Sequence, residues 1–259
     1  MTRKERAVSA AIRGYFELSY RLLLGSPEGR RFLDASSPVA PLPVHGYATH
    51  DDLDAVTTHL ALADGVHVLD LGSGLGGPAM ALGLRTGATI TGLEYAPRAV
   101  RSASSRSIAA GLQPRVSFLE GPWQRPPRLG ACGAYALDAL MFARIDGPLL
   151  IAIRDSLEGG GRLVTTLLTV GTGAHDPLAR AAERIGMYVV ESSDVTVALI
   201  RESARRRGVA RRLLLGRPHT VRGRLAMVLV VIEETGVLYQ ARRGRLRRWR
   251  TVVDLAGPG

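Results

Sequence analysis

The feature that most constrains the fold of this 259-residue chain is a glycine-rich segment that follows a short apolar run and precedes a helix-like segment. Residues 66–71 read VHVLDL, residues 72–77 read GSGLGG and residues 78–86 read PAMALGLRT. A short apolar run that breaks into glycines is typical of a buried parallel strand. Glycines let the backbone turn sharply and come close to a ligand. The pattern predicts a strand, a ligand-binding loop and a helix within a parallel α/β sheet.

Two acidic residues near the loop narrow the class of ligand. Nicotinamide and flavin enzymes also use such glycine loops, so the glycines alone do not choose between classes. Asp70 lies two residues before the first glycine, where a carboxylate would repel a pyrophosphate but suits a cationic group such as an ammonium. Glu94 ends the next predicted strand, where it can accept both hydroxyls of a ribose. Asp70 and the spacing from strand to loop argue against a nicotinamide dehydrogenase, although Asp70 or Glu94 could instead be structural.

From residue 66 onward, strand-like and helix-like segments alternate, which predicts a parallel sheet with helices on both faces. The predicted strands cover residues 66–71, 88–94, 115–121, 131–140, 161–169, 188–196 and, as a final edge strand, 248–256. The predicted helices cover residues 3–24, 51–62, 78–86, 97–112, 148–157, 175–187, 197–208 and 222–240. We expect a Rossmann-like α/β fold with a doubly wound, mostly parallel sheet of about seven strands and an N-terminal helical cap.

The segment before the first strand is expected to form a separate cap. Residues 1–50 would supply an N-terminal helix and a proline-rich loop, and residues 51–259 the core. Thr49 or Asp51 is the expected N-cap of the helix that follows the loop. An insertion at about 170–225 would set substrate specificity.

Composition excludes several classes of protein. Hydrophobic residues make up 46% and charged residues 22% of the chain, which suits a packed core rather than a disordered segment. The single cysteine, Cys132, cannot form an intramolecular disulfide or a cysteine-rich metal site, and we expect no metal. The N-terminus lacks the apolar run of a signal peptide. The apolar stretch 226–232 is far shorter than the roughly 20 residues that span a bilayer. We therefore expect a soluble cytoplasmic protein without a membrane partner.

The segments VLDLGSGLGG, TGLEYAPRAV and RVSFLEG resemble those of class I S-adenosylmethionine-dependent methyltransferases, and the likeness extends over about residues 43–169. HGYATHDDLDAV, YALDALMF and LEGGGRLV resemble the small-molecule methyltransferases of bacterial specialised metabolism. The resemblance implies S-adenosylmethionine as the methyl donor and S-adenosylhomocysteine as the product. It implies that Asp70 orients the methionine part of the donor, that Glu94 holds the ribose and that Tyr95 lies beside the adenine. The full set of implied cofactor residues is Tyr47, Asp70, Gly72, Ser73, Gly74, Glu94, Tyr95, Gly121, Pro122, Trp123 and Leu137.

Two positions depart from the pattern of that family. Pro122 occupies the place where the family usually has an acidic residue facing the adenine amino group, so backbone groups or Trp123 would have to replace that contact. Trp123 could equally be a packing residue at the rim. Cys132 stands where the family often has an aspartate. This difference concerns the geometry of the loop more than the binding of the donor.

Methyl transfer from a sulfonium is an in-line substitution, so the enzyme mainly positions the acceptor and excludes water. A general base is needed only when the acceptor must lose a proton. The candidate catalytic residues are Asp138, His45 and His175, with His50 as a further histidine to consider. Asp138 ends the fourth strand beside the expected methyl group, but it could instead be the N-cap of a short segment at 139–143. Each histidine could also be structural.

Aromatic residues on the N-terminal helix are candidates for the substrate pocket. Tyr15, Phe16 and Tyr20 recur at helical spacing, which fits either a pocket wall or ordinary core packing.

The net charge of +11 lies entirely in the last quarter of the chain, where fifteen arginines face four acidic residues over 201–259. Such a segment fits a nucleic-acid partner, an anionic substrate or a solvated arginine-rich surface with buried stems. Aromatic residues are only 5% of the chain, and the fourth strand is not followed by an asparagine-proline-proline-aromatic motif. These facts disfavour nucleic acid and favour the solvated surface.

The sequence thus predicts a methyltransferase that acts on a small natural-product type of molecule, and an anionic or aromatic acceptor is compatible with it. The alternatives are a cyclase that keeps the methyltransferase fold and uses the cofactor without transferring its methyl group, and, less favoured, a nucleic-acid methyltransferase. The acceptor atom and the oligomeric state stay open, a homodimer being compatible.

Overall fold

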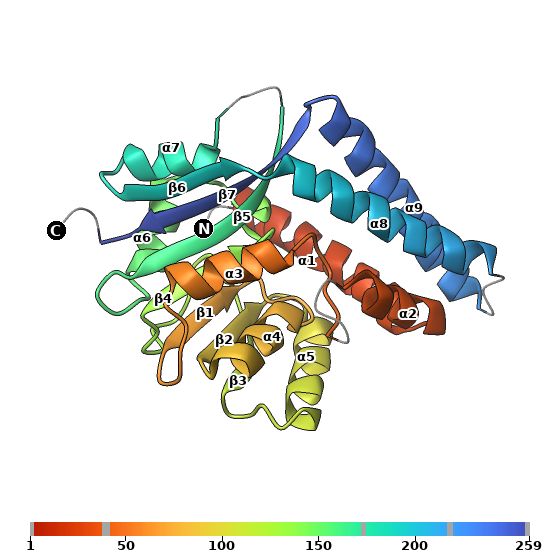
Figure 1. The fold of residues 1–259 in the computed structure, drawn as a ribbon, viewed down its shortest axis with the longest axis horizontal. Coiled ribbons are helices and arrows are strands. Elements are labelled where there is room, and N and C mark those ends of the chain that lie inside the picture. The colour runs from red at the N-terminus through yellow and green to blue at the C-terminus, as the bar shows by residue number, and fades with distance from the viewer. Residues whose placement is uncertain (1–2, 38–41, 172–174, 217–219, 257–259) are drawn as a thin grey trace.

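The computed structural model describes residues 3–37, 42–171, 175–216 and 220–256 and shows a sheet with helices on both faces (Figure 1). The strands are β1 (His67–Leu71), β2 (Thr89–Glu94), β3 (Val116–Glu120), β4 (Gly133–Leu137), β5 (Arg162–Val170), β6 (Tyr188–Asp194) and β7 (Leu246–Asp254). The helices are α1 (Arg3–Leu24), α2 (Pro27–Ser36), α3 (His50–His59), α4 (Gly77–Thr86), α5 (Pro97–Ala109), α6 (Gly147–Arg154), α7 (Pro177–Glu183), α8 (Thr196–Leu215), α9 (Val221–Arg242) and the short 3-10 helix η1 (Leu140–Phe142).

The seven-stranded sheet has the order β3-β2-β1-β4-β5-β7-β6. Strands β1 to β5 pair in parallel, whereas β7 is antiparallel to both β5 and β6. The chain runs outward from β1 to β3 and then returns to β4 on the other side of β1. The carboxyl ends of β1 and β4 therefore form a topological switch point, the place where open α/β sheets bind ligands. The predicted fold class is confirmed.

The predicted position of the last strand is wrong. β7 is not an edge strand, because it lies between β5 and β6, with Trp249 paired to Leu167 on one side and to Asp194 on the other. The edge of the sheet is β6. The order of antiparallel strands depends on pairing between distant segments, and the local pattern of residues 248–256 carries no signal for it.

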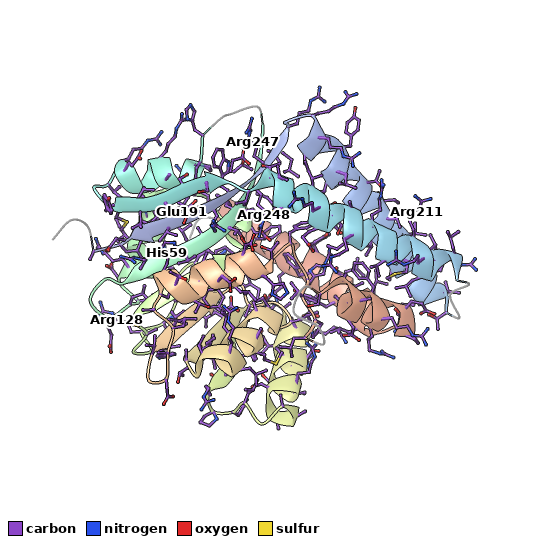
Figure 2. The ribbon with its side chains drawn as sticks, viewed as in Figure 1. His59, Arg128, Glu191, Arg211, Arg247 and Arg248 are labelled. Carbon is purple, nitrogen blue, oxygen red and sulfur yellow. The ribbon has the colours of Figure 1, made fainter. Side chains whose placement is uncertain are left out.

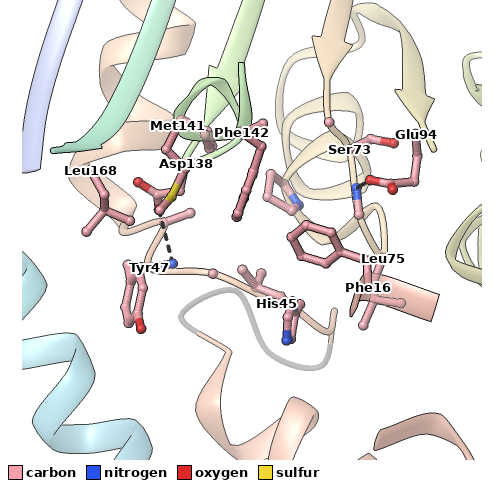
Figure 3. Close-up of a pocket in the computed structure, with 18 of the residues that line it drawn as sticks. Phe16, His45, Tyr47, Ser73, Leu75, Glu94, Asp138, Met141, Phe142 and Leu168 are labelled. Carbon is pink, nitrogen blue, oxygen red and sulfur yellow. Dashed lines mark hydrogen bonds between the residues drawn. The ribbon is translucent and has the colours of Figure 1, made fainter. Parts of the chain in front are cut away.

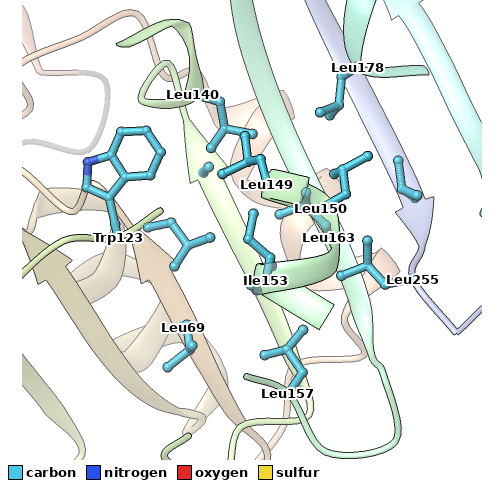
Figure 4. Packing of buried hydrophobic residues seen from close by; sticks show 14 of the residues in the cluster. Leu69, Trp123, Leu140, Leu149, Leu150, Ile153, Leu157, Leu163, Leu178 and Leu255 are labelled. Carbon is cyan, nitrogen blue, oxygen red and sulfur yellow. The ribbon is translucent and has the colours of Figure 1, made fainter. Parts of the chain in front are cut away.

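Each face of the sheet is covered by its own apolar cluster. One cluster joins β1 and β4 to α6 and α7, with Leu149, Ile153 and Leu178 among its buried members (Figure 4). The other joins the opposite face to α3, α4 and α5 through residues such as Val56 and Met80. Both clusters lie behind the switch point and hold the carboxyl ends of the strands in place.

The helices α1, α2, α8 and α9 gather at one end of the molecule, on the right in Figure 1. They share a third apolar cluster that also receives Leu75 of the glycine-rich segment. Helix α2 was not predicted, because the residues after 24 were expected to form a proline-rich loop. Ser26 in fact accepts the N–H of Gly29 and Pro27 occupies the first turn, which is a pattern of helix starts.

A pair of long helices is inserted between the last two strands along the chain. α7 and β6 belong to the layers of the core, and the inserted pair is α8 and α9, between β6 and β7. This helical pair covers 196–242 and overlaps in part the region at about 170–225 that is expected to set specificity.

Within the described ranges, none of the helices has the length and apolar character needed to cross a membrane. The same ranges contain no group of three or more histidine, cysteine, aspartate or glutamate side chains placed to hold a metal ion.

Candidate functional site

A cavity of about 330 Å³ opens at the switch point, between the carboxyl ends of the strands and the helical cap (Figure 3). Of the residues predicted for the site, those that line the cavity are His45, Tyr47, Asp70, Gly72, Ser73, Gly74, Glu94, Tyr95, Trp123, Leu137 and Asp138. The aromatic residues Tyr15, Phe16 and Tyr20 of α1 line it as well. Gly121 and Pro122 are not part of its wall, and Pro122 is exposed.

The glycine-rich segment is held against the end of β2 by its own backbone. The N–H groups of Gly72 and Ser73 both donate to the carbonyl of Leu93, at 2.8 and 3.0 Å. The Gly74 N–H donates to Oε2 of Glu94 at 2.9 Å. This shape brings the backbone of the glycine-rich segment to the cavity wall, where Ser73 and Gly74 are lining residues (Figure 3).

Gly72 is required by both conformation and space. Its φ is +81°, and an added Cβ would lie 2.4 Å from the Cβ of Ala139. We expect Gly72→Ala to lower the free energy of unfolding by about 3 kcal/mol, because the left-handed conformation costs roughly 1–2 kcal/mol and overpacking roughly 1–3 kcal/mol. Gly65 is a matched control, since its φ is +82° and a Cβ there would meet nothing within 4 Å. Urea unfolding of the two variants measures the difference, and equal losses would contradict the close approach at Gly72.

Asp70 ends β1 with one carboxylate oxygen unsatisfied. Its side chain is buried, and Oδ2 has no hydrogen-bond partner among the described residues. Burial raises the pKa of Asp70 to about 7; the buried hydroxyl of Tyr135 acts against this rise, and the nearby carboxylate of Glu94 adds to it. The hydroxyl of Ser73 is also buried and has no hydrogen-bond partner among the described residues. The buried carboxylates of Asp70 and Glu94 lie on one wall of the cavity, and this arrangement fits a ligand that carries a cationic group.

Glu94 ends β2 next to Asp70, and its two oxygens are fixed in place. Oε2 accepts from Gly74 and Oε1 accepts from the Ala96 N–H at 2.9 Å. Each carboxylate oxygen can accept a second hydrogen bond, so the side chain keeps capacity for two hydroxyls of a ligand. Burial raises the pKa of Glu94, whereas these backbone donors lower it. Glu94 could therefore bind a ligand group that carries two hydroxyls.

Trp123 has two roles at once. Its side chain is 3% exposed and belongs to the apolar cluster on one face of the sheet, and it also lines the cavity. Its ring packs edge-on against Tyr95 with the ring centres 6.1 Å apart. Packing and a contact with a flat ligand group are therefore compatible at this residue.

The segment 42–49 crosses the mouth of the cavity. Of the two predicted N-caps, Thr49 is the one that caps α3, and it forms a capping box with Asp52. His45 lies beside Phe16 and Tyr20, with its Nε2 3.4 Å from the Ser19 hydroxyl. Burial lowers the pKa of His45 to about 3, and the charge of Arg206 adds to the effect. His45 is thus a neutral group that hydrogen-bonds, and a weak base.

Asp138 is engaged on both carboxylate oxygens. Arg248 Nε donates to Oδ1 at 2.8 Å, and the Tyr47 N–H donates to Oδ2 at 3.2 Å (Figure 3). The Thr166 hydroxyl also donates to Oδ1 at 3.0 Å. The alternative role as an N-cap is wrong, because η1 has no side-chain cap. These contacts argue against a free general base and make Asp138 a link between the sheet and the segment over the cavity.

His175 and His50 lie outside the cavity. His175 is exposed just before α7, and His50 is exposed at the first turn of α3. The structure does not bring His175 to the predicted site, because α7 covers the part of the sheet formed by β6 and β7.

Several cavity residues were not predicted. Met141 and Phe142 come from η1, Leu168 from β5, and Arg206, Glu233 and Val237 from α8 and α9 (Figure 3). Arg206 is 4% exposed, and its Nε donates to Glu234 at 2.6 Å. Glu234 also accepts from the hydroxyls of Ser203 and Tyr47. Arg206 stands in an arginine-rich run, and Glu233 and Val237 stand in or next to an apolar run. Neither pattern indicates which side chains point into the cavity.

No family model matches the chain. A sterol 24-C-methyltransferase of Pneumocystis carinii is 33% identical to it over 72 residues, which are 28% of this chain and 19% of that protein. The matched segments cover between 19% and 28% of the length of the curated relatives.

Solved structures match over most of the chain. A geranyl diphosphate methyltransferase in complex with GPP and sinefungin has a TM-score of 0.71 at 14% identity and covers 95% of this chain and 99% of its own. The [4+2]-cyclase SpnF has a TM-score of 0.69 at 20% identity and covers 92% and 95%. A methyltransferase of Thiobacillus denitrificans in complex with S-adenosylhomocysteine has a TM-score of 0.62 at 20% identity and covers 83% and 94%. The chain therefore has the Rossmann-like methyltransferase fold.

Proposed function

We propose that the protein transfers a methyl group from S-adenosylmethionine to a lipophilic small molecule. The observation that carries the proposal is that one cavity joins a polar wall and an apolar wall. The polar wall holds the buried carboxylates of Asp70 and Glu94, with Ser73 and Gly74 of the glycine-rich segment beside them. The apolar wall is formed by side chains such as Phe16, Phe142 and Leu168. Similar proteins support the acceptor class, since their names record sterols and geranyl diphosphate.

The residues of the polar wall would bind the donor. Asp70 would pair with the amino group of its methionine part, Ser73 would hydrogen-bond to the same part, and Glu94 would accept the two ribose hydroxyls. When bound, S-adenosylmethionine supplies an electrophilic methyl group. An ammonium beside Asp70 would return that carboxyl to its ionised form, because an opposite charge lowers the pKa of an acid.

The other residues of the cavity would orient the acceptor and exclude water. Phe16, Met141 and Phe142 give the acceptor side an apolar surface, which favours a lipophilic group and removes competing water. Asp138 is already paired and His45 is a weak base. The arrangement therefore suits an acceptor atom that is nucleophilic without prior loss of a proton.

The test is an incubation with methyl-labelled S-adenosylmethionine and a panel of sterols and prenyl diphosphates. We expect label in an acceptor for the wild-type protein and none for Asp70→Ala. Absence of label with every acceptor, while S-adenosylhomocysteine still binds, would contradict methyl transfer but leave the donor site intact.

A second candidate is a cyclase that holds the cofactor without using its methyl group. The likeness to the [4+2]-cyclase SpnF over 92% of the chain favours it, as do the pairing of Asp138 with Arg248 and the lowered pKa of His45. The same incubation separates the two, because a cyclised product without label supports the cyclase.

A further inference from the structure

The outward face of α9 carries an apolar stripe. Val221, Leu225, Leu229, Ile232 and Tyr239 are between 44% and 88% exposed. Their spacing of three, four or seven residues places them on one side of the helix. The opposite side packs into the cap through residues such as Met227 and Leu238.

This stripe departs from the usual pattern of a surface helix, which turns a polar face to the solvent. From Val221 to Tyr239 it extends about 27 Å along the helix at 1.5 Å per residue. Contiguous exposed apolar surface of this kind marks a site of interaction with a protein or a lipid.

Arginines lie at both ends of the stripe. Arg222 and Arg224 are exposed at its start, and Arg242 and Arg243 are exposed at its end. The guanidinium of Arg243 lies 4.5 Å from the centre of the Tyr239 ring. In the part of the chain that the structure describes, none of these four arginines forms an ion pair with an acidic side chain, whereas Arg247, Arg248 and Arg250 of β7 do. Arg211 of α8 is also exposed and unpaired in that part (Figure 2).

The combination of charge and apolar surface selects the partner. A second copy of this chain would bring like charges together, because the arginines lie at both ends of the stripe in each copy. Nucleic acid would satisfy the arginines but leave the apolar side chains against phosphates and water. An anionic lipid surface satisfies both, since phosphates pair with the arginines and the acyl region takes up the apolar side chains.

We propose that the outward face of α9 binds the surface of an anionic lipid bilayer. The sequence predicted no membrane partner, because the apolar run 226–232 was judged only against the length of a spanning helix. Binding parallel to the surface requires no such length.

The flank of α9 next to the stripe borders the candidate site. Glu233 and Val237 of α9 and Tyr15 of α1 line the cavity, and Leu18 of α1 is 55% exposed. A bilayer bound along α9 would therefore lie beside the cavity. Delivery of a lipophilic acceptor from that bilayer rests on the proposed function, whereas lipid binding itself does not.

The test is co-sedimentation of the full chain with phosphatidylcholine vesicles, with and without phosphatidylglycerol. We expect binding that requires phosphatidylglycerol and weakens with salt. Ile232→Ser should weaken it by about tenfold, the order expected when one aliphatic side chain is lost from an apolar contact. Ile108→Ser on α5 is the matched control, because Ile108 is 63% and Ile232 is 62% exposed. A second pair of variants compares vesicle binding by R224Q/R242Q, at the two ends of the stripe, with vesicle binding by R101Q/R115Q, away from it. All four arginines are exposed, and we expect the larger loss in R224Q/R242Q.

Four results would overturn the proposal. These are no vesicle binding by the folded wild-type protein, equal losses in Ile232→Ser and Ile108→Ser, a dimer in sedimentation velocity that Ile232→Ser dissociates, and binding to duplex DNA or RNA that is tighter than binding to vesicles. Calorimetry with S-adenosylhomocysteine on the same preparation reports separately on the proposed function.

Discussion

Replacing Asp70 by asparagine is expected to stabilise the ligand-free protein at pH 8 by about 4 kcal/mol and to weaken its binding of S-adenosylhomocysteine. The stability change follows from the pKa of Asp70, which rises from 3.8 to about 7 in the folded chain, at about 1.4 kcal/mol per unit. An acid with a raised pKa favours the folded state at low pH, and this contribution is lost as the pH rises from about 4 to 7. The advantage of Asp70→Asn should therefore vanish near pH 4.

The expected effect of Asp70→Asn on ligand affinity is a loss, in contrast to the gain in stability. An ionised Asp70 beside an ammonium forms a charge-assisted hydrogen bond worth about 1.5–3 kcal/mol, so Asp70→Asn should lower the affinity by about 10- to 100-fold at pH 8. In the wild type the affinity should also fall as the pH drops below 7, because Asp70 must lose its proton before it pairs. The variant should lack this dependence.

Asp176→Asn is the matched control, because Asp176 is 4% and Asp70 is 3% exposed. Asp176 accepts hydrogen bonds from the Leu178 N–H and the Ser192 hydroxyl and lies away from the cavity. We expect Asp176→Asn to destabilise the protein and leave ligand affinity unchanged. Urea unfolding and calorimetry at several pH values measure both quantities. A destabilised Asp70→Asn with normal affinity would show that Asp70 is structural.

Arg248→Ala is expected to lower the free energy of unfolding by about 3–5 kcal/mol, since removal of one member of a buried ionic cluster leaves uncompensated charge. Arg248 is fully buried between the sheet and α3 (Figure 2). Its guanidinium reaches Asp138 at 2.8 Å and Asp52 at 2.9 Å. Loss of Arg248 would leave both carboxylates buried and would loosen the contact of Asp138 with the Tyr47 N–H.

Arg250→Ala provides the comparison on the same strand. Arg250 pairs with Glu191 at 3.0 Å, but both side chains are more than 20% exposed. A pair that is open to solvent contributes about 0–1 kcal/mol, so this variant should unfold almost as the wild type does. Equal losses in the two variants would contradict a buried clamp at Arg248.

Much of the fold could be predicted because its signals are local. The strand, loop and helix over 66–86 follow from apolar runs and glycines, and the structure places them within one or two residues. Helix α2 was missed although Ser26 and Pro27 carry the signal of a helix start. The place of β7 could not be predicted, since it depends on which distant strands pair with it.

The arginines show where sequence patterns stop being informative. The arginines over 201–259 were interpreted mainly as a solvated surface. Among them, Arg206 lines the cavity and Arg248 is fully buried, while Arg211 and Arg242 are exposed. Burial of a charged side chain depends on a partner from elsewhere in the chain, here Glu234, Asp138 and Asp52. Nothing next to the arginines in the sequence names those partners.

The donor site is the central claim, and calorimetric titration with S-adenosylhomocysteine tests it most directly. We expect saturable binding of one molecule per chain, weakened in both Asp70→Asn and Glu94→Gln and unchanged in Asp176→Asn. The absence of binding by the folded wild-type protein, or equal affinity in all four proteins, would contradict the account.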